Sequence, residues 1–196
     1  MAASGSDVFV SSIYFPESNI TICLTKRGNI ADAYLGNSRD LNDQSDDEFN
    51  YLNSLEGIKK NVGDLNVTYY DNFDWDELRG KIKSIGNFNI TYYDRFGWDE
   101  TKGKIKSIGE VNFTYYDRFG WDETKGKLKS IGKFEITYYD RFDWDELKGK
   151  MKTIGNTSFI YHDRFGLSYK QGRLKAINGT TDNINMLRLK SRLNDF

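Results

Sequence analysis

The chain has 196 residues, a length that suits one ordinary domain or one elongated repeat domain. Its 28 Lys and Arg residues balance 29 Asp and Glu residues, which argues against a generally basic nucleic-acid-binding protein and against an acidic disordered tail. The single cysteine, Cys23, excludes an internal disulfide, and with only one histidine there is no Cys/His cluster for zinc or an iron–sulfur centre. No apolar run approaches the roughly 18 residues of a membrane helix.

The first 65 residues show little regularity. Residues 1–6 lack an apolar signal region and read as an added leader that replaces a signal peptide. We interpret residues 7–65 as an N-terminal cap with a degenerate β repeat and an acidic insertion. Residues 19–24 and 28–30 suggest the degenerate unit. Residues 38–56 carry six acidic side chains against one arginine, and residues 57–65 match the second half of a repeat unit.

Five tandem units of 23 residues follow, and they decide the fold class. They span residues 66–88, 89–111, 112–134, 135–157 and 158–180, and the third reads NFTYYDRFGWDETKGKLKSIGKF. The fifth unit departs from this pattern at His162, Leu167 and Asn178, where the others carry Tyr, Trp and Gly. Terminal units of repeat arrays lack one neighbour, so we expect unit 5 to be a C-terminal cap. For the tail, residues 181–196, a last strand and a short amphipathic helix both stay open.

Each unit predicts two strands. Residues 88–93 are β-branched and aromatic with period-two alternation, and residues 104–108 form the second strand. Between units, a Gly-led pair such as Gly109-Glu110 predicts a tight hairpin turn. Within each unit, a connection of about ten residues ends on a glycine in every copy. The predicted class is all-β: tandem 23-residue antiparallel β-hairpin repeats that form an elongated twisted sheet or a solenoid-like array.

Two registers compete across the tight turn. A two-residue loop places Ile108, Val111 and Phe113 on one face, but Lys104 and Lys106 share that face. A three-residue loop groups Ile105 with Val111 and Phe113 but leaves Ile108 in the turn. A slip of one residue moves every side chain to the other face. Neither register is clean, so we expect partly apolar rows on both faces.

The ten-residue connection carries the most chemistry, because it combines aromatic rings with carboxylates. Sugar-binding sites use this pairing to stack and orient rings. The candidate ligand-binding residues are Trp75, Trp98, Trp121, Trp144, Asp76, Asp99, Asp122 and Asp145. The alternative is that Phe and Trp fold over the sheet edge as a buried ladder, since aromatic side chains mostly serve packing.

Two other patterns compete with this interpretation. Asp71, Asp76 and Glu77, with their equivalents in later units, could supply oxygen ligands to calcium, although their spacing does not match an EF-hand. A ladder of cations could form a stripe for an anionic polymer, or a solvated face. The ladder consists of Lys81, Lys83, Lys104, Lys106, Lys127, Lys129, Lys150, Lys152, Arg173 and Lys175.

The sequence favours a protein that is not an enzyme and needs no cofactor. His162 occupies a position where other units carry Tyr, which suggests a tolerated substitution rather than a base. No nucleophile elbow, phosphate loop or dinucleotide fingerprint occurs. Carboxylate pairs recur in every unit, whereas an enzyme normally builds one asymmetric site.

Tyr-Tyr-Asp followed by Gly-Lys-[Ile/Leu]-Lys-Ser-Ile resembles the Tyr-Asp (Rhs-type) repeats of bacterial secreted proteins over residues 66–180. Here about eight residues separate Asp from Gly, as residues 72–79 illustrate. The resemblance implies a repetitive hairpin sheet in a periplasmic, cell-surface or secreted bacterial protein, with no catalytic role for the repeats.

These patterns together predict a non-enzymatic structural or binding module. Identical faces at a fixed spacing suit weak multivalent contacts with a polysaccharide, a protein or a second copy of the chain. We expect no specific nucleic-acid partner.

Overall fold

The computed structural model describes residues 8–24, 30–36, 61–62 and 65–188. Within these ranges the regular elements are antiparallel strands and two short 3-10 turns, η1 (Pro16–Ser18) and η3 (Ser168–Lys170). The predicted all-β class is therefore confirmed. Residues 1–7, which include the expected leader, and the acidic insertion at 38–56 lie outside the described residues.

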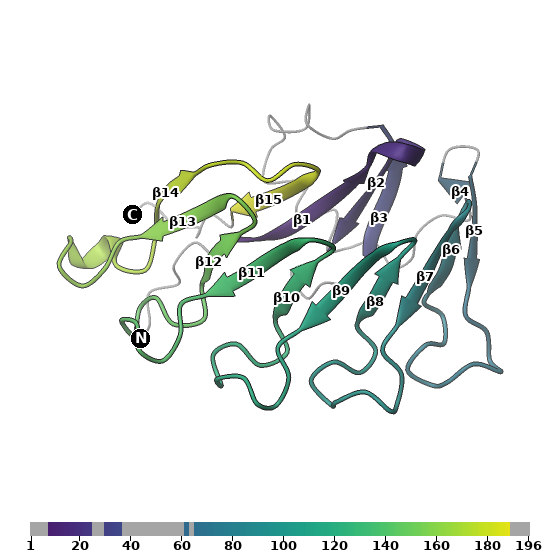
Figure 1. The fold of residues 1–196 in the computed structure, drawn as a ribbon, viewed down its shortest axis with the longest axis horizontal. Coiled ribbons are helices and arrows are strands. Elements are labelled where there is room, and N and C mark those ends of the chain that lie inside the picture. Colours follow the sequence, from purple (N-terminus) through teal and green to yellow (C-terminus); the bar gives the residue numbers. More distant parts are fainter. Residues whose placement is uncertain (1–7, 25–29, 37–60, 63–64, 189–196) are drawn as a thin grey trace, which may run out of the picture.

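The larger sheet contains eleven strands in strict chain order, each hydrogen-bonded to the next (Figure 1). The strands are β4 (Asn61–Val62), β5 (Leu65–Tyr69), β6 (Ile82–Ile85), β7 (Phe88–Tyr92), β8 (Ile105–Ile108), β9 (Val111–Tyr115), β10 (Leu128–Ile131), β11 (Phe134–Tyr138), β12 (Met151–Ile154), β13 (Thr157–Tyr161) and β14 (Leu174–Asn178). The long connections lie at one end of the strands and the tight turns lie at the opposite end (Figure 1). This arrangement is the predicted tandem hairpin array.

A four-stranded sheet combines the two ends of the chain. Its strands are β1 (Val8–Phe15), β2 (Ile20–Leu24), β3 (Ile30–Leu35) and β15 (Ile184–Arg188), in the order β15-β1-β2-β3. The tail thus contributes a strand over 184–188. The strands β2 and β3 pair antiparallel, but they lie in this second sheet, so they are not a unit of the repeat array. In contrast, β4 pairs with β5 as the second half of a unit would.

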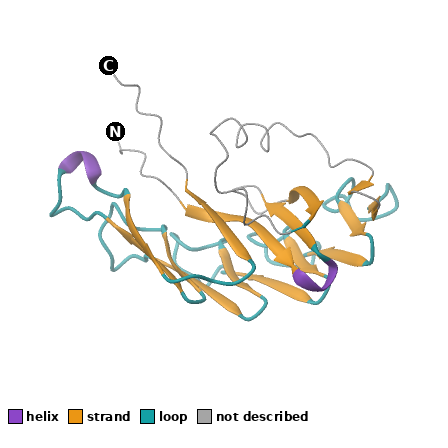
Figure 2. Cartoon of the chain, turned by 90° about the horizontal axis from the view of Figure 1, so that it is seen from above, coloured by secondary structure: helices purple, strands orange, loops and turns teal. Residues whose placement is uncertain are grey.

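The four-stranded sheet packs on one face of the repeat sheet (Figure 2). One apolar cluster joins both sheets, with Ile22 from the small sheet and Ile85, Ile108 and Ile154 from the repeats all fully buried. The rings of Phe15 and Phe88 meet across the interface at a centroid distance of 5.5 Å. Burying one such isoleucine stabilises the fold by about 1.5–3 kcal/mol. The predicted elongated sheet is therefore one layer of a two-layer sandwich.

The tight turn has two residues, and a β-bulge resolves the conflict between the two registers. Ile108 pairs with Val111 across Gly109 and Glu110. On the other side of the strand, the pairing of β7 and β8 skips Lys106, since Thr91 opposes Ser107 and Tyr92 opposes Ile105. The extra residue lets Ile105 and Ile108 both face the core. The expectation of partly apolar rows on both faces assumed strict alternation, which does not hold through a bulge, so Ile105 and Ile108 lie on the same face.

Glycine is required at the first turn position. Gly109 has a φ of +55°, and a Cβ there would lie 2.8 Å from the ring of Phe88. A positive φ at this position alone is the pattern of a type II′ hairpin turn, which matches the twist of the flanking strands.

Candidate functional site

Each long connection folds into a compact loop through its own hydrogen bonds. In unit 2, the Asp94 carboxylate accepts the backbone N–H of Phe96 at 2.9 Å, which turns the chain out of β7. The carbonyl of Trp98 then accepts the backbone N–H groups of Thr101 and Lys102 at 2.8 and 2.9 Å. Gly103, at a φ of +72°, returns the chain to β8. The same bonds recur in units 1, 3 and 4, so these four copies present their side chains in one geometry. In unit 5 the N–H of Gln171 bonds to the carbonyl of Ser168 instead.

The loops place aromatic and arginine side chains in a continuous row. The Trp98 ring meets the edge of the Phe119 ring of the next unit at a centroid distance of 6.1 Å, with the ring planes 86° apart. The Arg118 guanidinium lies 4.1 Å from the centroid of the same indole ring. We call this set the aromatic row. It comprises Phe73, Trp75, Arg95, Phe96, Trp98, Arg118, Phe119, Trp121, Arg141, Phe142, Trp144, Arg164 and Phe165.

The rings of the aromatic row contact one another from unit to unit, but they are not buried. The four tryptophans are 42–44% exposed, and the phenylalanines from Phe96 to Phe165 are 79–83% exposed. The sequence left open whether these rings pack or face solvent, and the structure has both features: contact between units and exposure of the ring surfaces. Exposed phenylalanine rings in a line are uncommon on a soluble surface and mark an interaction site.

A glutamate helps to hold two of the arginines, Arg95 and Arg164, over their indoles. Arg95 Nε lies 3.9 Å from Glu77 Oε1, and Arg164 Nη2 lies 3.9 Å from Glu146 Oε2. These glutamate side chains are largely buried, at 12% and 18% exposure. Among the described residues, one carboxylate oxygen of each has no hydrogen-bond partner. The arginine is therefore placed by a charge below it and by an aromatic ring beside it.

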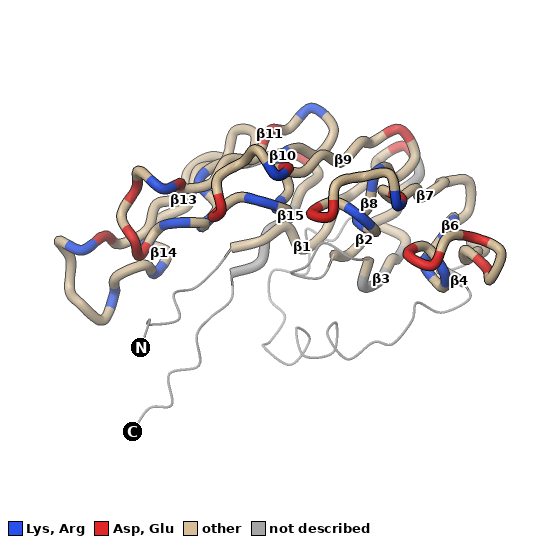
Figure 3. Tube along the Cα trace, turned by 90° about the horizontal axis from the view of Figure 1, so that it is seen from below, with Lys and Arg blue, Asp and Glu red and all other residues tan. Residues whose placement is uncertain are grey.

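The candidate aspartates flank the row in exposed positions. Asp76 pairs with Arg79 at 2.7 Å, Asp122 with Lys125 at 2.6 Å and Asp145 with Lys148 at 2.5 Å, each within one loop. The hydrogen bond from the Lys125 ammonium lowers the pKa of the Asp122 carboxyl, and Lys148 lowers the pKa of Asp145 in the same way. Charges therefore alternate along the loops, as seen from the loop side (Figure 3).

The structure does not bring the proposed calcium ligands together. Asp71 accepts the backbone N–H of Phe73 at 2.8 Å, Asp76 pairs with Arg79, and Glu77 faces Arg95 of the next unit. In the described part of the chain, no group of three or more His, Cys, Asp or Glu side chains is placed to hold a metal ion. The geometry thus favours the aromatic row over the cation alternative.

The ladder of lysines divides into two structural classes. The first lysine of each unit connects neighbouring units: Lys104 donates to the carbonyl of Gly126 and lies 5.0 Å from the Tyr115 ring centroid. Burial lowers the pKa of Lys104, as it does for Lys81. The second lysine occupies the bulge and is exposed, as Lys106 illustrates.

A second ladder, formed by tyrosines, connects the units through their backbones. Tyr93 donates its hydroxyl to the carbonyl of Phe113 in the next unit at 3.0 Å. Its ring meets the edge of Tyr115 at 5.9 Å. Burial raises the pKa of Tyr115, with a smaller contribution from the nearby Tyr93. These contacts fix the spacing of the loops, and therefore of the aromatic row.

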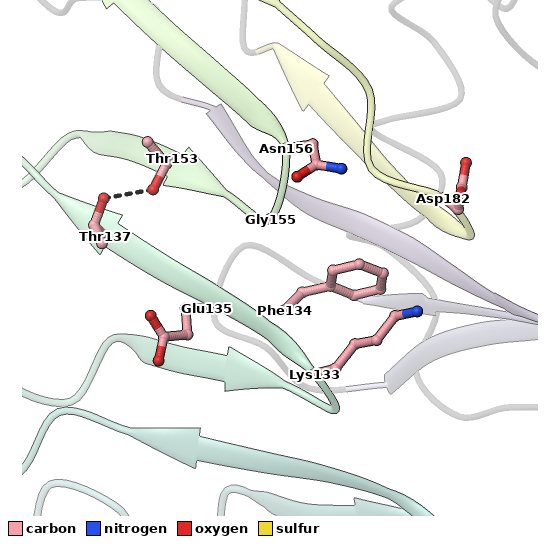
Figure 4. A pocket seen from close by; sticks show the side chains of 8 residues that line it. All are labelled: Lys133, Phe134, Glu135, Thr137, Thr153, Gly155, Asn156 and Asp182. Atoms are coloured by element: carbon pink, nitrogen blue, oxygen red, sulfur yellow. Dashed lines mark hydrogen bonds between the residues drawn. The ribbon is translucent and has the colours of Figure 1, made fainter.

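A hollow lies on the opposite, tight-turn side near β11 and β12 (Figure 4). Its acidic side chains, Glu135 and Asp182, lie at opposite ends of the lining, and the hydroxyls of Thr137 and Thr153 bond to each other at 2.6 Å. The lining does not converge on a single point, so the hollow does not compete with the aromatic row as a candidate site.

The sequence pattern indicated the tryptophans and aspartates as candidate binding residues, but it did not indicate the arginines or the high exposure of the phenylalanines. The arginine signal was present, since Arg follows the Tyr-Tyr-Asp motif in units 2 to 4 and follows the corresponding aspartate in unit 5. Its partner is the Trp of the preceding unit, 20 residues earlier, which one unit taken alone does not reveal.

Comparisons of the chain with protein-family models, with curated proteins and with solved structures give no match. Among the described residues, no helix is long and apolar enough to cross a membrane.

Proposed function

We propose that this chain is a non-enzymatic binding module of a secreted or envelope-associated protein, and that its aromatic row binds a linear polysaccharide. The observation that carries the proposal is the line of tryptophan–phenylalanine pairs, with phenylalanine rings at least 79% exposed and the same geometry in every unit. The faces of sugar rings are apolar and stack on such surfaces, whereas their hydroxyls need hydrogen-bonding partners.

The polar groups beside the row suit a carbohydrate better than an apolar protein surface. Asp99 follows Trp98 in the chain and the Arg118 guanidinium lies 4.1 Å from the centroid of the Trp98 ring, so the two side chains can supply an acceptor and donors for sugar hydroxyls. The loops carry both signs of charge, so the row has no strong preference for a charged polymer (Figure 3). We therefore propose an uncharged or weakly charged polysaccharide.

The spacing of the row supports multivalent binding. Two strands separate equivalent rings, a distance of about 9–10 Å. Each contact is weak, but an extended polymer that meets several units gains affinity from the high local concentration of the next contact. Long chains should therefore bind much more tightly than short oligosaccharides.

The test is binding of linear neutral polysaccharides, such as soluble glucans, xylans and mannans, by affinity electrophoresis and calorimetry. The double substitution of Phe96 and Phe119 by Ala should weaken binding about tenfold or more. The chain should stay folded with a modestly lower melting temperature, because both rings are exposed but each loses its edge contact with Trp75 or Trp98. Ile160→Ala is the control, since it removes exposed apolar surface from the strand β13 and not from the loops. The proposal is wrong if no polysaccharide binds, or if the control variant loses as much affinity as the double variant.

A further inference from the structure

The face of the eleven-stranded sheet that points away from the four-stranded sheet, here called the outer face, carries a second ordered surface. In units 1 to 4 the bulge leaves two adjacent residues on this face, because the apolar residues on either side of them face the core. Lys106 and Ser107 are the pair in unit 2. The lysines align in what we call the lysine row: Lys83, Lys106, Lys129, Lys152 and Lys175, all exposed.

No ion pair joins the lysine row to an acidic side chain within residues 65–188. Among the described residues, the contacts of the first four ammonium groups are with tyrosine rings, at 5.0–6.0 Å from the centroids of Tyr70, Tyr93, Tyr116 and Tyr139. On the strands β5 to β14, Glu135 is the single acid at an outward position. The tyrosine rings support the lysines and leave their charges open to solvent.

Uncharged hydrogen-bonding groups run parallel to the lysine row. The hydroxyls of Thr91 and Ser107 bond to each other at 2.7 Å, and those of Thr114 and Ser130 at 2.6 Å. Beside them lie the exposed amides of Asn89 and Asn112. The outer face therefore offers one cation per unit and several uncharged donors and acceptors between successive cations.

We infer that the lysine row binds a linear acidic polysaccharide in which charged and uncharged sugars alternate. Successive cations are two strands apart, about 9–10 Å, which is the scale of one disaccharide in an extended glycan. The hydroxyl pairs and asparagines between the cations match the hydroxyl-rich, uncharged sugar between two carboxylates. This site is separate from the aromatic row and stands on different residues.

The surroundings of the row disfavour wider or more densely charged partners. Duplex DNA carries one negative charge per about 1.7 Å of its axis, several times the charge density of the row. The loop carboxylates at one end of the strands, such as Asp94 and Asp117, would also repel a duplex or an anionic membrane broad enough to reach them (Figure 3). A narrow chain that follows the lysines across the strands would approach fewer of these acids than a duplex or a membrane surface would.

The test compares binding of hyaluronan, which has one carboxylate per disaccharide, to the full chain and to two charge-matched double variants. Replacing Lys106 and Lys129 by Gln removes two members of the row. Replacing Lys102 and Lys125 by Gln removes two exposed cations from the loops of the same units. A melting curve of each variant serves as the control for folding.

We expect the Lys106/Lys129 variant to lose affinity for hyaluronan roughly tenfold or more and the control to lose little. Binding of the wild type should also weaken as salt is raised. Equal losses in the two variants would overturn the inference, as would no hyaluronan binding by the wild type. Tighter binding of a single-stranded oligonucleotide or of vesicles with anionic lipid would also overturn it, since the row would then serve another polyanion. The aromatic-row variant Phe96→Ala/Phe119→Ala should bind hyaluronan normally, which keeps the two proposals distinguishable.

Discussion

Unit 3 and unit 5 share the same backbone plan but differ in the contacts that they offer to a following unit. Unit 3 gives the next unit the Tyr116 hydroxyl, 3.0 Å from the carbonyl of Ile136, and the Trp121 ring, 5.8 Å from the ring of Phe142. Unit 5 has His162 and Leu167 at these positions, and β14 is the last strand of its sheet. Both of these changed residues are ones whose partner would lie in a following unit.

The residues that unit 5 keeps serve the loop itself or the preceding unit. Asp163 still accepts the backbone N–H of Phe165 at 3.0 Å, and Gly172 keeps a φ of +71°. Arg164 and Phe165 still contact Trp144 of unit 4. Unit 1 shows the complementary change, because Asn72 replaces the arginine and Phe73 is 99% exposed. The array therefore has a direction. Each of units 1 to 4 extends a tyrosine and a tryptophan to the next unit. The next unit meets the tyrosine with a backbone carbonyl and a tyrosine ring, and the tryptophan with an arginine and a phenylalanine.

The largest expected effect is at a core position that is buried in unit 2 and exposed in unit 5. Ile108 is fully buried, whereas the equivalent Ile177 in unit 5 is 51% exposed. Ile108→Ala should lower the free energy of unfolding by about 2–5 kcal/mol, because it leaves a cavity between the sheets. Ile177→Ala should cost less than about 1 kcal/mol. Urea unfolding of both variants checks this, and similar costs would mean that unit 5 is not a solvent-facing cap.

A smaller effect should follow from copying the terminal unit into the interior. Trp121→Leu imitates Leu167 and removes the contacts with Phe142 and Arg141. Because the indole is partly exposed, we expect a loss of about 1–2 kcal/mol in the free energy of unfolding. The reverse change, Leu167→Trp, should add nothing, since β14 has no following unit. A stabilised Leu167→Trp variant in the same urea titration would contradict the direction assigned to the array.

The tyrosine ladder should contribute less per position. Tyr116→Phe removes one hydroxyl and one hydrogen bond to the carbonyl of Ile136, at an expected cost of about 1 kcal/mol. His162→Phe is the control in unit 5, where no equivalent bond is donated forward, and its midpoint of urea unfolding should stay unchanged. If both substitutions cost the same, the hydroxyl does not connect the units.

The smallest effect is expected on the outer face, where unit 5 replaces a hydroxyl pair by Ile160 and Ala176. Introducing the same apolar pair in unit 3, as Thr114→Ile with Ser130→Ala, removes both partners of one hydrogen bond together. Removing both partners of a hydrogen bond together is nearly neutral, so the free energy of unfolding should change by no more than about 0.5 kcal/mol. A melting curve measures this as a small shift of the melting temperature. A larger loss would assign the hydroxyl pairs a structural role beyond pairing with each other.

The sequence determined the repeat, its boundaries and the all-β class, because these follow from local patterns. The 23-residue period, the β-branched and aromatic strands and the glycines that mark each loop end are visible in one unit after another. Glycine at positions 103 and 109 is a local requirement of a positive φ, so its meaning could be inferred without a tertiary contact. The candidate loop was found for the same reason.

Only the tertiary structure decided which face of each strand is buried and how the units meet. The bulge at Lys106 breaks period-two alternation. It is stabilised because it lets Ile105 and Ile108 both pack in the core, which is formed only in the tertiary structure. The pairing of β1 with β15 joins residues about 175 positions apart, between segments outside the repeat, so no local pattern encodes it. The half-exposed state of the tryptophans likewise depends on Arg and Phe side chains of the next unit, which reach each indole only after the sheet has formed.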